Sequence, residues 1–313
     1  MSSATVPDAA PSNWVDRLAP PSWLPYLRLA RFDRPIGAWL LLFPCWWGQA
    51  LGELSVGRAY PNLWFIALFL VGAFVMRGAG CTYNDIVDRD FDASVARTAA
   101  RPIPSGQVSV VEAWMFFAVL CLVGLVVLLQ FNLFTIVLGV SSLVLIAIYP
   151  FMKRLTYWPQ LMLGLTFKWG ALVGWVAVTG SLSLAAIALY AGSVLWTIGY
   201  DTIYAHQDKE DDLSIGLKST ALRFGDATPL WLVAFYAGAV LLWAVAGALA
   251  GARLAYFLAL GLSAVQLAWQ VATLKTEDPA NCLARFRSNQ LVGWALFAGA
   301  LIDMGLVALF DPA

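Results

Sequence analysis

Charged residues are scarce in this chain of 313 residues, because they make up 12% of the sequence, against about 25% in a typical soluble domain. Hydrophobic residues make up 61%. A soluble fold of this size could not bury so much apolar surface, so a soluble protein is excluded and an integral membrane protein is indicated. The 19 basic and 19 acidic residues balance to a formal net charge of zero. This balance argues against nucleic acid as a partner, and no feature of the sequence predicts a protein partner.

Histidine is nearly absent, and His206 alone cannot build a metal or haem site that needs several histidines. The four cysteines have neither paired nor metal-ligand spacing. They are interpreted as small apolar residues in or near membrane spans: Cys45, Cys81, Cys121 and Cys282. No signal peptide is expected, because residues 1–25 are polar and proline-rich and the first apolar run follows Arg34. A transit peptide is not expected either, since residues 1–16 contain no arginine.

Long apolar runs fill most of the chain. A bilayer span needs about 20 mostly apolar residues, and continuously apolar runs favour helices over an alternating β-barrel. The sequence therefore predicts an all-α integral membrane protein in which a polar N-terminal segment, residues 1–30, precedes one domain, residues 31–313. Pro44 makes the ends of the first helix uncertain. Nine transmembrane helices are expected near residues 36–52, 61–82, 111–130, 133–150, 160–179, 185–205, 228–250, 253–274 and 289–310.

Lysine and arginine are distributed unevenly between the two sides of the membrane. Nearly all of them lie in the N-terminal segment or after even-numbered helices, whereas the loops after odd-numbered helices hold only Arg58 and Arg253. Positively charged loops stay on the cytoplasmic side. We therefore expect a multi-pass protein of the bacterial inner membrane with a cytoplasmic N-terminus and active site.

Two acidic clusters follow the second and sixth helices and so face the same compartment. In the first, "YNDIVDRDFD", four side chains share one helical face: Asn84, Asp85, Asp88 and Asp92. In the second, "DTIYAHQDKEDD", four more do so: Asp201, Tyr204, Asp208 and Asp212. Carboxylates stacked in this way repel each other unless a cation relieves the repulsion. Oxygen ligands without histidine or cysteine suit a hard cation, and Mg²⁺ is the candidate.

Basic side chains on the same side could balance the charge of a phosphate. They are Arg97, Arg101, Lys153, Arg154 and Lys218. Arginine binds phosphate in a bidentate manner and lysine binds it as a point charge. Mg²⁺ commonly bridges carboxylates and substrate phosphates, so the two kinds of residue fit one ligand. The alternative is that these charges are membrane anchors and solvated loops.

The same residues resemble those of a known family. "NDIVDRDFD" matches the pattern NDxxDxxxD, and "DTIYAHQD" with Asp212 matches DxxYxxxDxxxD, two signatures of the UbiA superfamily of intramembrane aromatic prenyltransferases. Longer stretches are similar to its 4-hydroxybenzoate polyprenyltransferase branch, from about residue 28 to the C-terminus: "RFDRPIGAWLLLFP", "RGAGCTYNDIVDRDFDASVARTAARPIPSG", "YPFMKRLTYWPQLMLGLTFKWG" and "DTIYAHQDKEDDLSIGLKSTA". The resemblance implies nine helices around a central cavity with a cytoplasmic cap.

The resemblance also implies a reaction and its residues. A polyprenyl diphosphate would alkylate 4-hydroxybenzoate ortho to its hydroxyl with the help of Mg²⁺, a step of ubiquinone biosynthesis within the lipid bilayer. The implied metal ligands are Asp85, Asp88 and Asp92 with Asn84, which also contacts substrate, and Asp208 with Asp212. The implied diphosphate contacts are Arg97, Arg101, Lys153 and Arg154. Lys218 is a further candidate because of its positive charge. Arg77 would contact the aromatic acid. Asp201 is the candidate for orienting or deprotonating its hydroxyl, and Tyr204 for positioning it.

Two charges inside predicted helices have no role in this scheme. Lys168 departs from the family pattern, and it would either face the cavity, pair with a carboxylate or extend to the membrane surface. Asp303 in the ninth helix is unexplained. Two other functions remain open, namely transfer to another acceptor such as a naphthoate, homogentisate or haem, and cation-coupled transport, because acids within membranes often mark ion pathways. Magnesium-dependent consumption of a prenyl diphosphate would separate an enzyme from a transporter.

Overall fold

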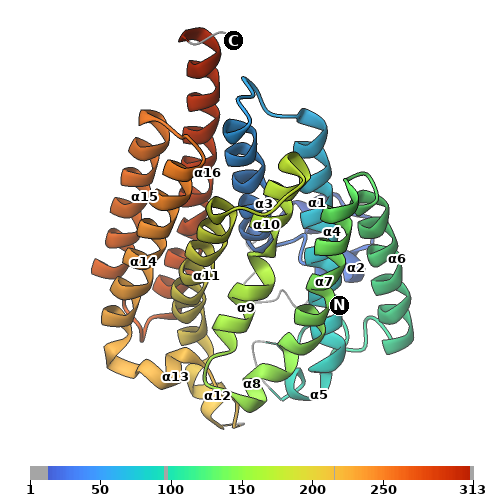
Figure 1. Ribbon diagram of the computed structural model, residues 1–313. Helices are drawn as coiled ribbons and strands as arrows, with labels where there is room; N and C mark the ends of the chain where they lie inside the picture. The colour runs from blue at the N-terminus through green and yellow to red at the C-terminus, as the bar shows by residue number, and fades with distance from the viewer. Residues whose placement is uncertain (1–12, 95–97, 215, 311–313) are drawn as a thin grey trace. The chain divides into compact units, whose positions relative to one another are not determined.

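The structure of the protein is a computed structural model that describes residues 13–94, 98–214 and 216–310 (Figure 1). The described residues form helices, turns and loops, without a strand among them, so the expected all-α class is confirmed. Contacts between Cα atoms divide the chain into two compact units. The first unit comprises Met1–Trp39 and Leu70–Gln130, and the second comprises Leu40–Phe69 and Phe131–Ala313.

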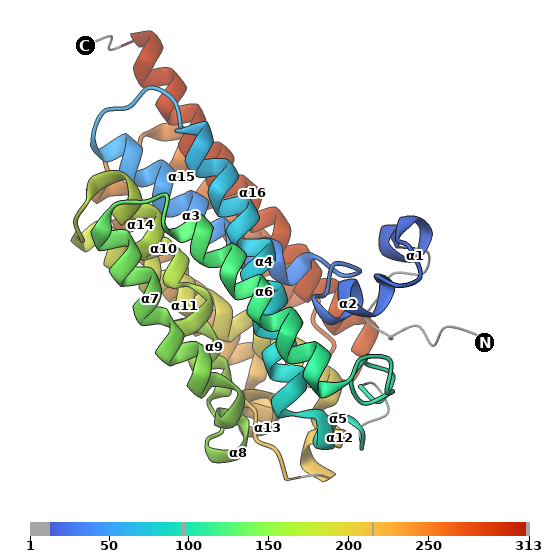
Figure 2. The same ribbon diagram turned by 90° about the vertical axis from the view of Figure 1, so that its right-hand side faces the viewer.

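The first unit contains short helices before and between its two long helices. Its elements are α1 (Trp14–Leu18), α2 (Leu24–Leu29), the start of α3 (Ile36–Ser55), most of α4 (Leu63–Val87), α5 (Arg89–Asp92) and α6 (Val110–Leu128). Ser109 and Glu112 form a reciprocal capping box at the start of α6. Helices α4 and α6 lie side by side (Figure 2), since a Cβ on Gly78 would meet the Leu120 side chain. Apolar residues near the ends of these helices pack into one core: Leu29, Ile86, Ile103, Val108 and Ala113.

The second unit holds most of the helices. They are α7 (Leu133–Ile148), η1 (Tyr149–Phe151), α8 (Met152–Leu155), α9 (Pro159–Phe167), α10 (Trp169–Thr179), α11 (Leu184–Ala205), η2 (His206–Asp208), α12 (Lys209–Ser214), α13 (Thr220–Phe224), η3 (Gly225–Ala227), α14 (Thr228–Leu249), α15 (Leu254–Ala272) and α16 (Pro279–Phe310). Helix α11 lies at the centre, packed against α9, α10, α14 and α16 (Figure 1). Helix α7 runs beside α9 and α10 (Figure 2). The second acidic cluster therefore follows the most enclosed helix of this unit.

All nine predicted helical segments are helical in the structure. Within the described residues, eight helices are long and apolar enough to cross a membrane. Helix α3 is not among them, and it carries the polar residues Gln49 and Glu53 in its second half. The fifth predicted helix is interrupted at Lys168, between α9 and α10, and the ninth begins at Pro279 instead of near residue 289.

Asp303 has a clear structural role in the second unit. Its carboxylate, on α16, is fully buried and accepts hydrogen bonds from the backbone N–H groups of Arg253 (2.6 Å), Ala255 (3.0 Å) and Tyr256 (3.1 Å). These donors are among the groups that the first turn of α15 leaves without helical partners. A carboxylate is also favourable at a helix N-terminus because of the helix dipole. Asp303 therefore caps a neighbouring helix, which explains a charge inside a membrane span.

Glycines bring α3 and α10 into direct backbone contact. A Cβ on Gly48 would overlap the carbonyl oxygen of Ala171, and a Cβ on Gly174 would overlap the carbonyl oxygen of Cys45. Small residues allow this close approach of helices in membranes. The second half of α3 is thereby fixed against α10, immediately beyond the interruption at Lys168.

Candidate functional site

The first acidic cluster lies where α4 ends. Helix α4 stops at Val87 and α5 begins at Arg89, with Asp88 between them at φ −97° and ψ 5°. The predicted single helix is therefore interrupted, but its spacing is kept. The Asp88 N–H donates to the Asn84 carbonyl at 2.9 Å, and the Asp92 N–H donates to the Asp88 carbonyl at 2.8 Å. The Asn84 side-chain amide also donates to the Asp88 carboxylate at 3.1 Å.

Asp85 is held by an arginine that the sequence analysis did not identify. Its side chain is 1% exposed, and both Oδ atoms accept hydrogen bonds at 2.7 Å from Nη2 of Arg31. Burial alone lowers the pKa of Arg31, but the Asp85 carboxylate, together with Cys81 and Asp33, more than offsets this effect and the pKa is raised. Nη1 of Arg31 donates to the carbonyls of Arg28 (3.0 Å) and Leu29 (3.4 Å), so both terminal nitrogens of the guanidinium are held.

The backbone of Arg31 is in the left-handed region, with φ at +62°. This conformation is uncommon for a residue other than glycine. It turns the chain between α2 and Pro35, which precedes the first turn of α3. The pattern "RFDRP" contains this arginine, but its partner lies 54 positions away, and periodicity within one segment cannot reveal such a pair.

A second arginine bridges two carboxylates of the first cluster. Nη1 of Arg101 donates to Asp92 at 2.7 Å and to Asp85 at 3.1 Å. Arg101 was predicted to contact a diphosphate, whereas here it neutralises carboxylates. The repulsion that was expected to require a metal ion is thus relieved in part by Arg31 and Arg101.

The oxygen donors of the first cluster fit Mg²⁺ in kind, because they are carboxylates and an amide without histidine or cysteine. Their present arrangement is only partly suited to a metal. Among the described residues, no group of three or more aspartate, glutamate, histidine or cysteine side chains is arranged to hold a metal ion. Both oxygens of Asp85 are bound by Arg31, one oxygen of Asp92 is bound by Arg101, and one oxygen of Asp88 is bound by the Asn84 amide.

Arg77 also lies in the first unit, on α4. Its guanidinium rests against Gly37, where a Cβ would come within 2.7 Å of the Arg77 Nε. The glycine of "RPIG" therefore leaves the space that this guanidinium fills at the start of α3. Arg97, another predicted diphosphate contact, falls outside the described residues.

The second acidic cluster continues from α11 through a tight turn. Asp201 and Tyr204 belong to α11, Asp208 ends η2 and Asp212 lies in α12. All four side chains are half-buried. The Tyr204 ring packs on Phe286 of α16 with their centroids 4.6 Å apart. The cluster is thus anchored at one end by packing and extends into short polar helices at the other.

Predicted basic residues gather in the same unit. The Lys218 backbone N–H donates to the Lys153 carbonyl at 2.9 Å, and its Nζ donates to the Leu155 carbonyl at 3.3 Å. The guanidinium of Arg154 lies 5.6 Å from the centre of the Phe151 ring. Lys153, Arg154 and Lys218 are therefore brought together by the contact between α8 and the loop before α13. Basic residues on adjoining segments are the residue types that bind phosphate.

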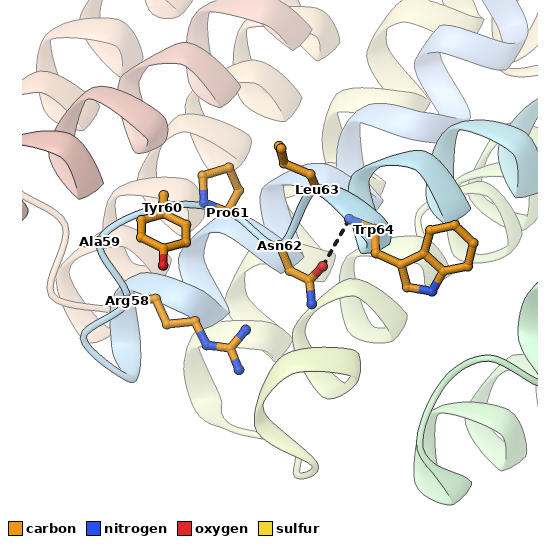
Figure 3. Close-up of a pocket in the computed structure, with 7 residues that line it drawn as sticks. All are labelled: Arg58, Ala59, Tyr60, Pro61, Asn62, Leu63 and Trp64. Carbon is orange, nitrogen blue, oxygen red and sulfur yellow. Dashed lines mark hydrogen bonds between the residues drawn. The ribbon is translucent and has the colours of Figure 1, made fainter.

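One cavity lies in the loop between α3 and α4 (Figure 3). It has a volume of about 730 Å³ and is lined by consecutive residues of this loop, from Arg58 to Trp64. The Asn62 side chain accepts the Trp64 N–H at 3.0 Å. Its lining contains no carboxylate, and within the second unit the loop lies at the opposite end from α12 (Figure 1). This cavity is therefore not where the predicted chemistry would occur.

Comparisons with known proteins place these features in a family. Residues 41–302 match the model of the UbiA prenyltransferase family. The 4-hydroxybenzoate polyprenyltransferase, mitochondrial, of Aedes aegypti is 50% identical over 89% of this chain and 63% of its own length. Proteins of the same name from Arabidopsis thaliana and Homo sapiens are 46% and 45% identical, over 93% and 96% of this chain and 71% and 79% of theirs. The chain thus spans less than two thirds of the mosquito relative.

Solved structures show the same fold. The apo structure of a UbiA homolog from Aeropyrum pernix aligns with a TM-score of 0.72 and 28% identity, covering 84% of this chain and 98% of the other. A UbiA homolog from Archaeoglobus fulgidus bound to GPP and Mg²⁺ aligns with a TM-score of 0.60 and 20% identity, covering 88% and 99%. At that identity the second likeness concerns the fold alone.

The relatives correct one prediction. All three are named as mitochondrial proteins, so the predicted bacterial inner membrane is wrong, and a mitochondrial membrane is the location that the relatives support. The multi-pass part of the prediction agrees with the eight candidate spans of the described residues. Apolar runs and the bias of basic residues report on the presence of a bilayer. They do not distinguish one membrane from another.

Proposed function

The chain belongs to the UbiA prenyltransferase family, and we propose that it transfers a polyprenyl group from polyprenyl diphosphate to 4-hydroxybenzoate. The new bond forms at the ring carbon ortho to the hydroxyl. This reaction is a membrane step of ubiquinone biosynthesis. The observation that carries this proposal is the 50% identity to a protein of that name over 89% of the chain. The two acidic clusters and the grouped basic residues are the chemistry that such a reaction needs.

The donor has a charged head, and the proposed contacts for it are carboxylates and basic side chains. Asp88 and Asp92 with Asn84 in the first cluster, and Asp208 with Asp212 in the second, are the proposed Mg²⁺ ligands. Asp85 joins them only where Arg31 or Arg101 releases one of its hydrogen bonds. When bound, Mg²⁺ would neutralise charge on the diphosphate. The proposed diphosphate contacts among the basic residues are Arg97, Arg101, Lys153, Arg154 and Lys218.

The acceptor is an aromatic acid, for which Arg77 offers a positive charge to the carboxylate. The half-buried Asp201 would accept a hydrogen bond from the hydroxyl and so orient the ring, with Tyr204 beside it. The carbon–oxygen bond of the donor breaks and diphosphate leaves with the electron pair. The ortho ring carbon supplies electrons to the new carbon–carbon bond, and the proton of that ring carbon would pass to the released diphosphate. The apolar, aromatic-rich helices would keep water from the allylic cation.

The test is a prenyl-transfer assay with the purified protein in lipid vesicles. We expect product from 4-hydroxybenzoate, dependence on Mg²⁺, and little product from a naphthoate or homogentisate, measured by mass spectrometry. Asp88→Asn and Asp92→Asn should abolish transfer, whereas Asp90→Asn should not, because the Asp90 side chain is 85% exposed. Cation transport without consumption of prenyl diphosphate would contradict the proposal, and so would preference for another acceptor.

A further inference from the structure

The side chain of Lys168 is completely buried within the second unit, inside a segment apolar enough to span a membrane. Its Nζ donates to the carbonyl oxygen of Leu40 at 2.6 Å. It also lies over the rings of Trp196 and Tyr200, 4.6 Å and 5.2 Å from their centres. Burial excludes extension to the membrane surface. The partners found here are a carbonyl and two aromatic faces, which stabilise an ammonium through charge–dipole and cation–π interactions.

The Leu40 carbonyl needs this donor because of a proline. In an α-helix each carbonyl accepts from the N–H four residues later, and for Leu40 that residue is Pro44, inside α3. Proline has no backbone N–H. The carbonyl of Leu40 would therefore be unpaired in a residue that is 1% exposed. Lys168, from another part of the sequence, supplies the missing hydrogen bond.

Lys168 can reach α3 because the fifth predicted helix is interrupted there. Its backbone, at φ −94° and ψ 0°, ends α9 and begins α10. Helix α10 then touches α3 through Gly48 and Gly174. The hydrogen bond to Leu40 and the glycine contact thus hold the same two elements together at neighbouring points.

The other side of the ammonium faces α11. The Trp196 ring beneath Nζ is itself fixed, because its N–H donates to the Asn289 side chain at 2.7 Å. Tyr200 is followed directly by Asp201. The Asp201 carboxylate is close enough to interact electrostatically with Lys168. The lysine therefore connects the turn of α3 that contains Pro44 to the turn of α11 that carries Asp201.

We propose that Lys168 is a positioning residue that sets the place of Asp201 against the aromatic acceptor. It does so by completing the hydrogen bonding of α3 at Pro44 and by packing on α11. This proposal rests on the proposed function for the identity of the acceptor. It assigns Lys168 no contact with either substrate.

The first variant is Lys168→Met, which keeps the length of the side chain and removes its donor. We expect kcat/KM for 4-hydroxybenzoate to fall at least about tenfold, since small displacements of reacting groups are costly. The KM for polyprenyl diphosphate should stay within about twofold, because the donor contacts are elsewhere. Lys275→Met, an exposed lysine in the loop before α16, is the control and should change neither value. Wild-type kinetics for Lys168→Met, or a KM for polyprenyl diphosphate raised by clearly more than about twofold, would overturn the proposal.

The second variant restores the hydrogen bond by another route. Pro44→Ala gives α3 a backbone N–H for the Leu40 carbonyl, so Lys168→Met combined with Pro44→Ala should recover most of the acceptor kcat/KM. This double variant also decides the matter if Lys168→Met alone does not fold. A double variant that folds without recovering acceptor kinetics, or fails to fold, contradicts the proposal. If the wild-type protein does not prenylate 4-hydroxybenzoate, the proposed function fails. Thermal unfolding of the two single variants and the double variant then still tests the coupling of positions 44 and 168.

Discussion

At the scale of single residues, Arg31 and Asp85 form a buried charge pair in the first unit. Removing one partner of a buried ion pair leaves a charge without compensation and costs about 3–5 kcal/mol. We predict that Arg31→Met lowers the thermal unfolding temperature in detergent by a large margin. Arg89→Met should have almost no effect, because Arg89 and Asp90 form an exposed pair at 3.5 Å and such pairs contribute little.

The double variant Arg31→Met with Asp85→Leu distinguishes the contribution of the ion pair to stability from that of the other contacts of Arg31. Replacing both members of a buried pair with apolar side chains is often neutral. We therefore expect this variant to regain much of the stability lost by Arg31→Met. If it is no more stable than the single variant, the contribution of Arg31 comes from its backbone turn and its bonds to the Arg28 and Leu29 carbonyls, not from Asp85.

Arg101 supports a prediction about metal binding. Its guanidinium occupies an oxygen of Asp92 that the proposed function assigns to Mg²⁺. Arg101→Gln should therefore tighten the binding of Mn²⁺, a spectroscopic substitute for Mg²⁺, when no diphosphate is present, and weaken the binding of inorganic diphosphate. Titration followed by electron paramagnetic resonance measures the first effect and calorimetry the second. Unchanged or weaker Mn²⁺ binding would show that the guanidinium and the metal do not compete.

The residue types of the candidate site could be predicted from the sequence, but their partners could not. The spacing of Asn84, Asp88 and Asp92 predicted one side of a helix, and the structure keeps that spacing across a helix break. Arg31 was missed because its contact with Asp85 is made in three dimensions, between segments far apart in the chain. Asp303 was unexplained for the same reason, since the amides that it caps belong to another helix.

At the scale of helices, the contact between α3 and α10 depends on Gly48. Gly48→Ala would push a methyl group into the Ala171 carbonyl, and overpacking of this kind costs about 1–3 kcal/mol. We predict a lower unfolding temperature and less folded protein in membranes. Gly261→Ala on α15 is the matched control, because no atom lies within 4 Å of its added Cβ, and it should be neutral or slightly stabilising. Equal unfolding temperatures for the two variants would contradict the close contact between α3 and α10.

Helix positions could be predicted well because apolar length alone reveals a membrane span. Two departures have physical causes. The interruption at Lys168 carries no proline or glycine at that residue and is accompanied by a hydrogen bond to a different helix. The early start of α16, at Pro279, adds nearly three polar turns, which contain Arg285 and Arg287 and which hydropathy assigned to a loop.

At the scale of the whole molecule, successive membrane spans place their connecting loops alternately on the two sides of the membrane. Tyr60, in the loop after α3, is 78% exposed, and Leu213, in α12, is 70% exposed. Tyr60→Cys and Leu213→Cys should react with a membrane-impermeant maleimide from opposite sides of sealed vesicles. The wild-type protein is the background, since Cys45, Cys81 and Cys282 are buried and Cys121 is half-buried. Labelling of both from the same side would contradict the predicted orientation.

The dependence of a proline in one helix on a lysine in another has an evolutionary consequence. A chain that keeps proline at position 44 needs an N–H donor reaching from position 168, whereas a chain with any other residue at 44 supplies its own. Substitutions at these two sites should therefore be correlated. A lineage should lose the hydrogen-bond donor at position 168 only after, or together with, the loss of the proline at position 44. A family history in which apolar side chains at 168 coexist freely with proline at 44 would show that natural selection does not recognise this bond.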